Sequence, residues 1–220
     1  MHDSRPRRRR TRPSLLLLSV LCVGLLFGGL GIGVALGGVM PLPYGPVTAI
    51  QQYVRTQPVA VQVLAVTMFA SSVPLAGYAA TASARLRQLD ATGPRPTIAL
   101  TGGILAAGSL ALAGLVGWTL SRPEVSADTA LVRAIYTLVF LLGGPAHIVA
   151  LGVLIAGIAV LTPKPTARIG LVIAALAELA TLVLVWPPLG VILPIARVCA
   201  LAWLVVAGAA LGSRDDLHPV

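Results

Sequence analysis

Three ionisable side chains lie inside stretches of sequence that are otherwise apolar: His147, Glu178 and Arg197. An imidazole can donate, accept or carry a proton, a carboxylate accepts hydrogen bonds, and a guanidinium donates five of them. In lipid such groups are costly unless they are paired or face a cavity, and they commonly mark functional sites. We therefore take these three residues as a candidate intramembrane polar site.

Their spacing predicts that they lie near one another. Glu178 and Arg197 are mirror positions about the turn at Pro187–Pro188, so two antiparallel helices joined there would bring them to one level. Reflecting Glu178 through the preceding loop lands near Leu151, one turn from His147, a depth difference of roughly 6 Å. We expect an ion pair between Glu178 and Arg197, with His147 in the same network.

A helix kink is expected just before the histidine, at Gly143, Gly144 and Pro145. Pro145 has no N–H to donate to the carbonyl of Leu141, and two glycines precede it. Broken helices of this kind line cavities in transporters. Two interpretations stay open, because the three ionisable residues could equally form a structural clasp that fixes the packing of the last three helices.

The sequence shows no recognisable catalytic or cofactor motif. It has no Gly-rich phosphate loop, no His-Glu-x-x-His and no Gly-x-Ser-x-Gly. Two of the three histidines, His2 and His218, lie in the tails, and Cys22 and Cys199 have no metal-ligand spacing. We expect no enzymatic activity, no cofactor and no bound metal.

Composition places the chain in a membrane. Of its 220 residues 57% are hydrophobic and 10% are charged, and the mean hydropathy is +0.92, more apolar surface than a soluble domain can bury. About 20 apolar residues cross a bilayer as a helix. Stretches of that kind, separated by clusters of proline and glycine, lie at 15–39, 58–84, 97–120, 131–161, 167–186 and 189–212.

These stretches predict an all-α fold, a polytopic bundle of six transmembrane helices. The expected organisation is a basic cytoplasmic tail (1–14), a six-helix transmembrane domain (15–212) and a short cytoplasmic tail (213–220).

The distribution of Lys and Arg predicts the orientation. Twelve of them lie in the two tails and in the loops after the second and fourth stretches, whereas Arg55, Arg122 and Arg133 lie on the opposite side. Positive charge is enriched on the cytoplasmic side. Both termini are therefore expected in the cytoplasm, with the protein in the plasma membrane. The excess of arginine over lysine, fifteen to one, and the richness in Ala, Val, Leu and Gly favour a bacterial source.

The N-terminal tail is rich in arginine. We expect this tail to contact anionic lipid headgroups rather than nucleic acid, because a transmembrane stretch follows directly. A secretory signal is the less favoured alternative, since the apolar run is long and no small-x-small cleavage site closes it. The headgroup contacts are assigned to Arg7, Arg8, Arg9, Arg10 and Arg12.

Glycines in the first stretch recur at small-xxx-small spacing, which permits close helix approach. This pattern is expected to serve packing within the chain, with homodimerisation as the alternative. The glycines are Gly24, Gly28, Gly29, Gly33 and Gly37.

The last ninety residues resemble a family of small bacterial multi-helix membrane proteins of unknown function, the DUF4386-like proteins. The resemblance rests on Gly143–His147, Ala177–Leu179 and Leu193–Arg197, with Trp203 and Gly208 following. It implies that His147, Glu178 and Arg197 occupy positions of that family's pattern. It does not indicate any particular activity, substrate or cofactor.

Three classes of function follow. The favoured one is a non-enzymatic membrane protein that binds or regulates an unidentified membrane protein partner, or forms a homo-oligomer. The second is a small transporter or lipophilic-ligand binder that uses His147, Glu178 and Arg197. An intramembrane enzyme is the third, for which a further acid or metal ligand is lacking.

Overall fold

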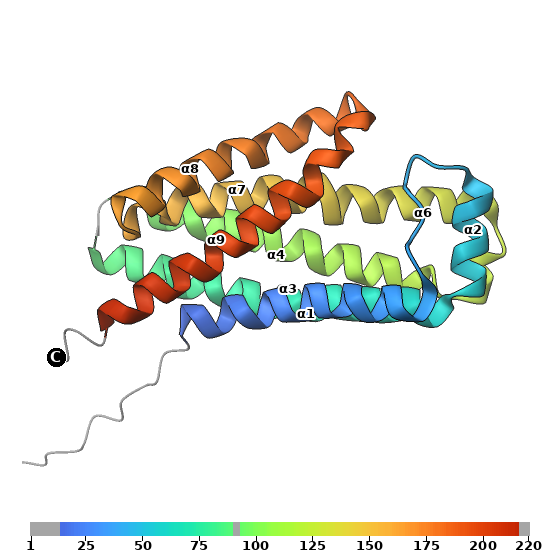
Figure 1. Cartoon of the computed structure of the whole chain (residues 1–220), viewed down its shortest axis with the longest axis horizontal. Coiled ribbons are helices and arrows are strands. Elements are labelled where there is room, and N and C mark those ends of the chain that lie inside the picture. The colour runs from blue at the N-terminus through green and yellow to red at the C-terminus, as the bar shows by residue number, and fades with distance from the viewer. Residues whose placement is uncertain (1–13, 90–92, 216–220) are drawn as a thin grey trace, which may run out of the picture.

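The computed structural model describes residues 14–89 and 93–215, and this part of the chain is a bundle of long helices (Figure 1). Six helical spans are long and apolar enough to cross a membrane. They confirm the expected all-α fold with six spans and identify the chain as a membrane protein. The spans are Leu15–Gly37, Pro58–Gln88, Arg95–Thr119, Thr129–Leu161, Lys164–Leu184 and Pro187–Leu211.

The spans follow one another as antiparallel neighbours. The first three are single helices, α1 (Leu15–Gly37), α3 (Pro58–Leu89) and α4 (Arg95–Thr119). The fourth joins α6 (Thr129–Leu141), the turn η1 (Leu142–Ala146), α7 (His147–Ile158) and η2 (Ala159–Leu161). The last two are α8 (Lys164–Glu178) with η3 (Leu179–Leu184), and η4 (Pro187–Val191) with α9 (Ile192–Asp215).

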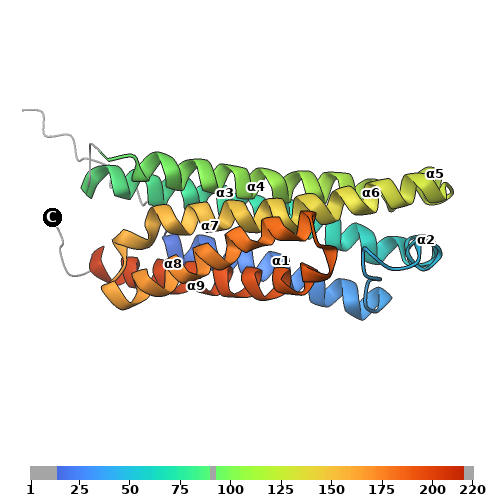
Figure 2. The same ribbon diagram turned by 90° about the horizontal axis from the view of Figure 1, so that it is seen from above.

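In space, α3 packs against α1 and α4, α4 packs against α7, and α7 packs against α8. The last helix, α9, crosses the bundle diagonally and returns to α1, so that α1 begins and α9 ends at the same end of the molecule (Figures 1 and 2). An even number of spans requires this arrangement.

Three glycines let α1 approach α3 closely. A Cβ atom at Gly29 would collide with Thr67, one at Gly33 would lie 2.7 Å from Leu64 Cγ, and one at Gly37 would lie 2.8 Å from Ala60 Cβ. At Gly24 and Gly28, by contrast, an added Cβ atom would meet nothing within 4 Å. The small-residue pattern therefore serves packing inside the chain at three of its five positions.

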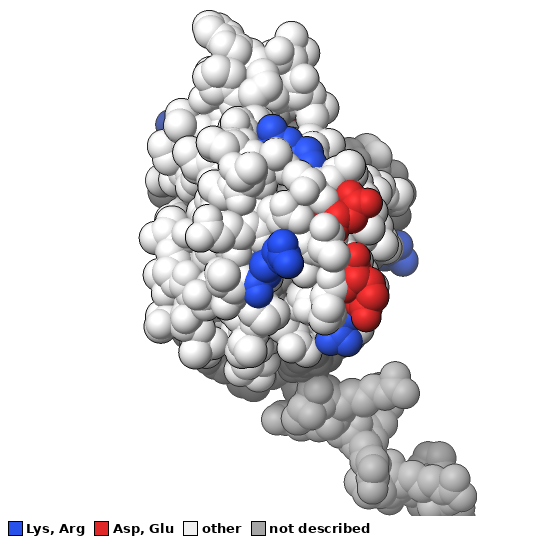
Figure 3. All heavy atoms as spheres, turned by 90° about the vertical axis from the view of Figure 1, so that its right-hand side faces the viewer, with Lys and Arg blue, Asp and Glu red and all other residues white. Residues whose placement is uncertain are grey.

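Two short helices were not expected from the sequence, α2 (Val47–Thr56) and α5 (Pro123–Ser126). Helix α2 lies across one end of the bundle, and it buries Ile50, Tyr53 and Val54 against α3 and α6 (Figure 1). Its apolar residues recur at intervals of three and four, the helical pattern, within a segment too short and polar to cross lipid. Charged side chains of both signs gather on this end of the molecule (Figure 3).

Side chains of α6 hold down the loop that precedes α2. Arg133 Nη1 donates to the carbonyls of Pro43 (3.1 Å) and Gly45 (3.0 Å), and the Tyr136 hydroxyl donates to the carbonyl of Pro41. Gln51 on α2 donates to the carbonyl of Ser126. The sequence predicted Arg133 only as a charge on the outer side of the membrane. In the structure its hydrogen bonds hold the loop before α2 in place.

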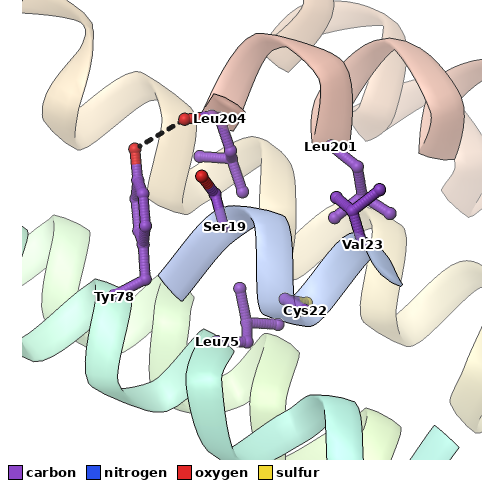
Figure 4. A pocket seen from close by; sticks show the side chains of 7 residues that line it. All are labelled: Ser19, Cys22, Val23, Leu75, Tyr78, Leu201 and Leu204. Carbon is purple, nitrogen blue, oxygen red and sulfur yellow. Dashed lines mark hydrogen bonds between the residues drawn. The ribbon is translucent and has the colours of Figure 1, made fainter. Parts of the chain in front are cut away.

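A small apolar cavity lies where α1, α3 and α9 meet (Figure 4). Its volume of about 10 Å³ leaves room for at most one water molecule. Beside it, the buried Tyr78 hydroxyl donates to the carbonyl of Leu204 at 3.2 Å, which ties α3 to α9. This cavity is too small for an organic ligand.

Candidate intramembrane polar site

Close packing between α4 and α7 positions the histidine. Gly102 of α4 contacts the backbone of α7 at Leu154, and a Cβ atom at Gly157 of α7 would lie 2.7 Å from the Ala99 nitrogen. Both glycines are buried. Because neither carries a side chain, the two backbones meet directly, and side chains further along α7 reach the backbone of α4.

The expected interruption of the fourth span takes the form of a π-helical turn, η1, at Leu142–Ala146. Pro145 lies inside it, and Gly143, Gly144 and Pro145 are all buried. A π turn accommodates the missing N–H of proline without ending the helix, and such turns are frequent at functional sites. His147 is the first residue after this turn.

The imidazole of His147 is fully buried, with 0% of the residue exposed. Its Nδ1 lies 2.9 Å from the carbonyl oxygen of Ala106 on α4. A carbonyl only accepts, so Nδ1 carries the proton and donates it. In the neutral ring Nε2 is then an acceptor, and no residue of the described chain gives it a hydrogen bond.

Arg197 lies on α9, next to Ala196, and Ala196 shares a buried apolar cluster with Ile148, the residue that follows His147. Its side chain is partly exposed, but its Nε atom is enclosed and has no hydrogen-bond partner among the described residues. A guanidinium inside a membrane span ordinarily has an acidic or carbonyl partner. Arg197 thus carries a positive charge that the described part of the chain does not neutralise.

Glu178 is the last residue of α8, and its side chain is exposed on the outside of the bundle. A Cβ atom at Gly152 of α7 would lie 3.3 Å from the Glu178 Oε1 atom, so the carboxylate lies along α7. The structure shows no ion pair from Glu178 to any described residue, Arg197 included. The expectation of a Glu178–Arg197 pair is therefore wrong for this structure.

The facing of the last two helices explains the difference. Both arms contain a 3₁₀ segment beside the turn, Leu179–Leu184 and Pro187–Val191, so their rise is similar. The Glu178 side chain is exposed on the outside of α8, however, whereas the Nε atom of Arg197 is enclosed in the bundle. Two residues at one level do not meet when their side chains point in different directions.

The candidate site is therefore two separate features. His147 and Arg197 lie close together inside the bundle, whereas Glu178 lies on its surface. The Ala106 carbonyl, which accepts from His147, belongs to the first of these features. The sequence could not single it out, because every residue has a backbone carbonyl group. The proposed headgroup contacts at Arg7–Arg12 lie outside the described residues. Among the described residues, no group of three His, Cys, Asp or Glu side chains could hold a metal ion.

Comparisons with known proteins give no match, since no family model, no curated protein and no solved structure is similar to this chain. The fold and the apolar spans define the class, a polytopic helical membrane protein. The resemblance to the DUF4386-like proteins stays a prediction.

Proposed function

We propose that this chain is a non-catalytic membrane protein whose α8 surface binds a transmembrane helix of another protein. The observation that carries the proposal is the exposed Glu178 carboxylate, which has no partner in the described chain and lies within the span Lys164–Leu184. A carboxylate that faces lipid is costly. A partner that covers it with a hydrogen-bond donor or a cation removes that cost.

The surface around Glu178 suits a helix. Leu171, Ala175, Glu178 and Leu182 follow one another at intervals of three and four residues, and all are exposed. Leu171 is 52% and Leu182 is 47% exposed. These four residues, which we call the α8 stripe, are exposed positions on either side of the Glu178 charge, three on α8 and Leu182 in the 3₁₀ segment η3.

Charge complementarity selects the partner. A second copy of this chain that packed through the α8 stripe about a two-fold axis would bring two Glu178 carboxylates together, and like charges repel strongly in lipid. A different protein that presents Lys, Arg or His at the depth of Glu178 would instead form a favourable pair. We therefore propose a heterologous partner.

The orientation belongs to the same proposal. The bias of twelve against three basic residues supports cytoplasmic termini in a bacterial plasma membrane, with the arginines of the N-terminal tail on anionic headgroups. Among the described residues, the exposed Lys164 and Arg168 begin α8 at the end where α1 starts. They are suited to the same headgroup layer.

Photo-crosslinking in native membranes tests the proposal. A photoreactive residue at Leu171, two turns from Glu178 on the α8 stripe, should crosslink to a transmembrane segment that carries a basic residue. Glu178→Gln should abolish this crosslink, and the matched change Glu124→Gln, at the exposed α5, should leave it intact. Crosslinks only to lipid or to a second copy, or a crosslink indifferent to Glu178→Gln, would refute the partner.

A second candidate function is the binding of a lipophilic ligand. The specific observation that favours it is that two buried atoms, His147 Nε2 and Arg197 Nε, have no hydrogen-bond partner among the described residues. This candidate uses side chains that the α8 stripe does not include, so the two functions can be tested separately.

A further inference from the structure

In the part of the chain that the structure describes, Arg197 has one buried donor and His147 one buried acceptor without a partner. The Nε–H of Arg197 can only donate, and Nε2 of the neutral His147 can only accept. We propose that these two residues form a binding site for the carboxyl group of a lipophilic acid, such as a long-chain fatty acid, that enters from the bilayer. The proposal rests on the second candidate function and is independent of the partner contact at Glu178.

The Nε–H of Arg197 needs an acceptor. A guanidinium stays protonated in proteins, and no described acidic side chain forms an ion pair with this one. A carboxylic acid offers one oxygen that can accept from this Nε–H and a hydroxyl that can donate to His147 Nε2. The bound acid would therefore supply the acceptor that α7, α8 and α9 do not.

Nε2 of His147 can accept a hydrogen bond from the O–H group of the acid. The acid enters with its proton, one of its oxygens accepts from Arg197, and the proton lies between the other oxygen and Nε2. Because Nδ1 is already committed to the Ala106 carbonyl, the ring presents Nε2 in a fixed direction. An ester, which has no such proton, can satisfy only one of the two groups.

The bilayer is the route of access. Arg197 is partly exposed, and its neighbours on α9 are open to lipid, with Ile195 59% and Val198 50% exposed. An alkyl chain can lie along this face of α9 while its carboxyl group reaches the guanidinium. The imidazole is enclosed, so the side chains that cover it must move before the carboxyl group can contact Nε2.

The test uses the full chain in nanodiscs of zwitterionic lipid, with palmitic acid labelled with ¹³C at its carboxyl carbon. Binding should shift the carboxyl resonance and give a palmitate adduct by native mass spectrometry. Methyl palmitate and acetate should compete weakly, since the first lacks the acid and the second lacks the chain. Acetate competing as well as palmitate would mean a site for free acids rather than for lipophilic ones.

Variants locate the site. Arg197→Gln should weaken palmitate binding by about tenfold or more, because a charge-assisted hydrogen bond is lost. Arg197→Lys, which keeps the charge without the Nε–H group, should fall between Arg197→Gln and the native chain. Glu178→Gln is the matched control and should bind palmitate normally.

Three results would overturn the proposal: acetate competing as well as palmitate, palmitate binding unchanged in both Arg197 variants, or methyl palmitate competing as strongly as the acid. The ester competition needs no variant, so it decides the question even if Arg197→Gln fails to fold. Crosslinking from Leu171 should survive Arg197→Lys. Loss of acid binding and loss of the partner are thus separate outcomes.

Discussion

At the residue scale, the two nitrogens of His147 have different roles. Nδ1 connects α7 to α4 through the Ala106 carbonyl, and Nε2 is unpaired among the described residues. The histidine is therefore partly a structural element, whatever its Nε2 binds. Replacement of His147 by Asn or by Gln can therefore separate the two roles.

We predict that His147→Asn is tolerated better than His147→Gln. An asparagine amide nitrogen occupies the place of Nδ1 and can donate to Ala106, whereas the glutamine amide lies further out and leaves that carbonyl without its histidine partner. A buried group that loses its partner costs about 1–3 kcal/mol. Melting temperatures in detergent would check this, and equal destabilisation by both variants would contradict the assigned role of Nδ1.

The absent ion pair leads to a second prediction at this scale. In a double-mutant cycle, Glu178→Gln and Arg197→Gln should be additive within about 0.5 kcal/mol, because the two side chains do not meet. Thermal unfolding of both single variants and the double variant would measure it. A favourable coupling well above that limit would show that the pair forms after all.

At the element scale, glycine contacts fix the position of the α7 backbone. Gly102→Ala should destabilise the protein by about 1–3 kcal/mol, because its new Cβ atom would collide with the backbone at Leu154. Gly108→Ala on the same helix is the control, since nothing lies within 4 Å of a Cβ there. Equal melting temperatures for the two variants would mean that α4 and α7 are further apart than these contacts require.

Most elements could be predicted from hydropathy and proline clusters, because each span must satisfy its own backbone hydrogen bonds in lipid. The interruption of the fourth span before His147 could also be predicted, from the Gly-Gly-Pro sequence. The facing of Glu178 and Arg197 was not, because it depends on the rotation of α8 and on the rotation of α9 about their own axes. Neither of these leaves a signal in local composition, and α2 was overlooked because its pattern is short.

At the scale of the whole molecule, we predict which positions face each side of the membrane. Cysteines introduced at Gly45 or at Ala127, the exposed neighbour of Ser126, near the end that carries α2, should react with an impermeant thiol reagent in intact cells. Cysteines at Thr92 or Ser213 should react only after the cells are opened, as the charge bias requires. Labelling of Ser213→Cys in intact cells would contradict the cytoplasmic placement of the C-terminus.

The whole-molecule claim is that Glu178 faces lipid until a partner covers it, and a lipid-soluble carbodiimide tests that claim most directly. The reagent forms a stable adduct with carboxyl groups that it reaches from the bilayer, and mass spectrometry of the α8 peptide reports the adduct. We predict modification of Glu178 in the purified chain in nanodiscs and clear protection in native membranes. Absence of modification in the purified chain, or equal modification in both settings, would contradict the claim.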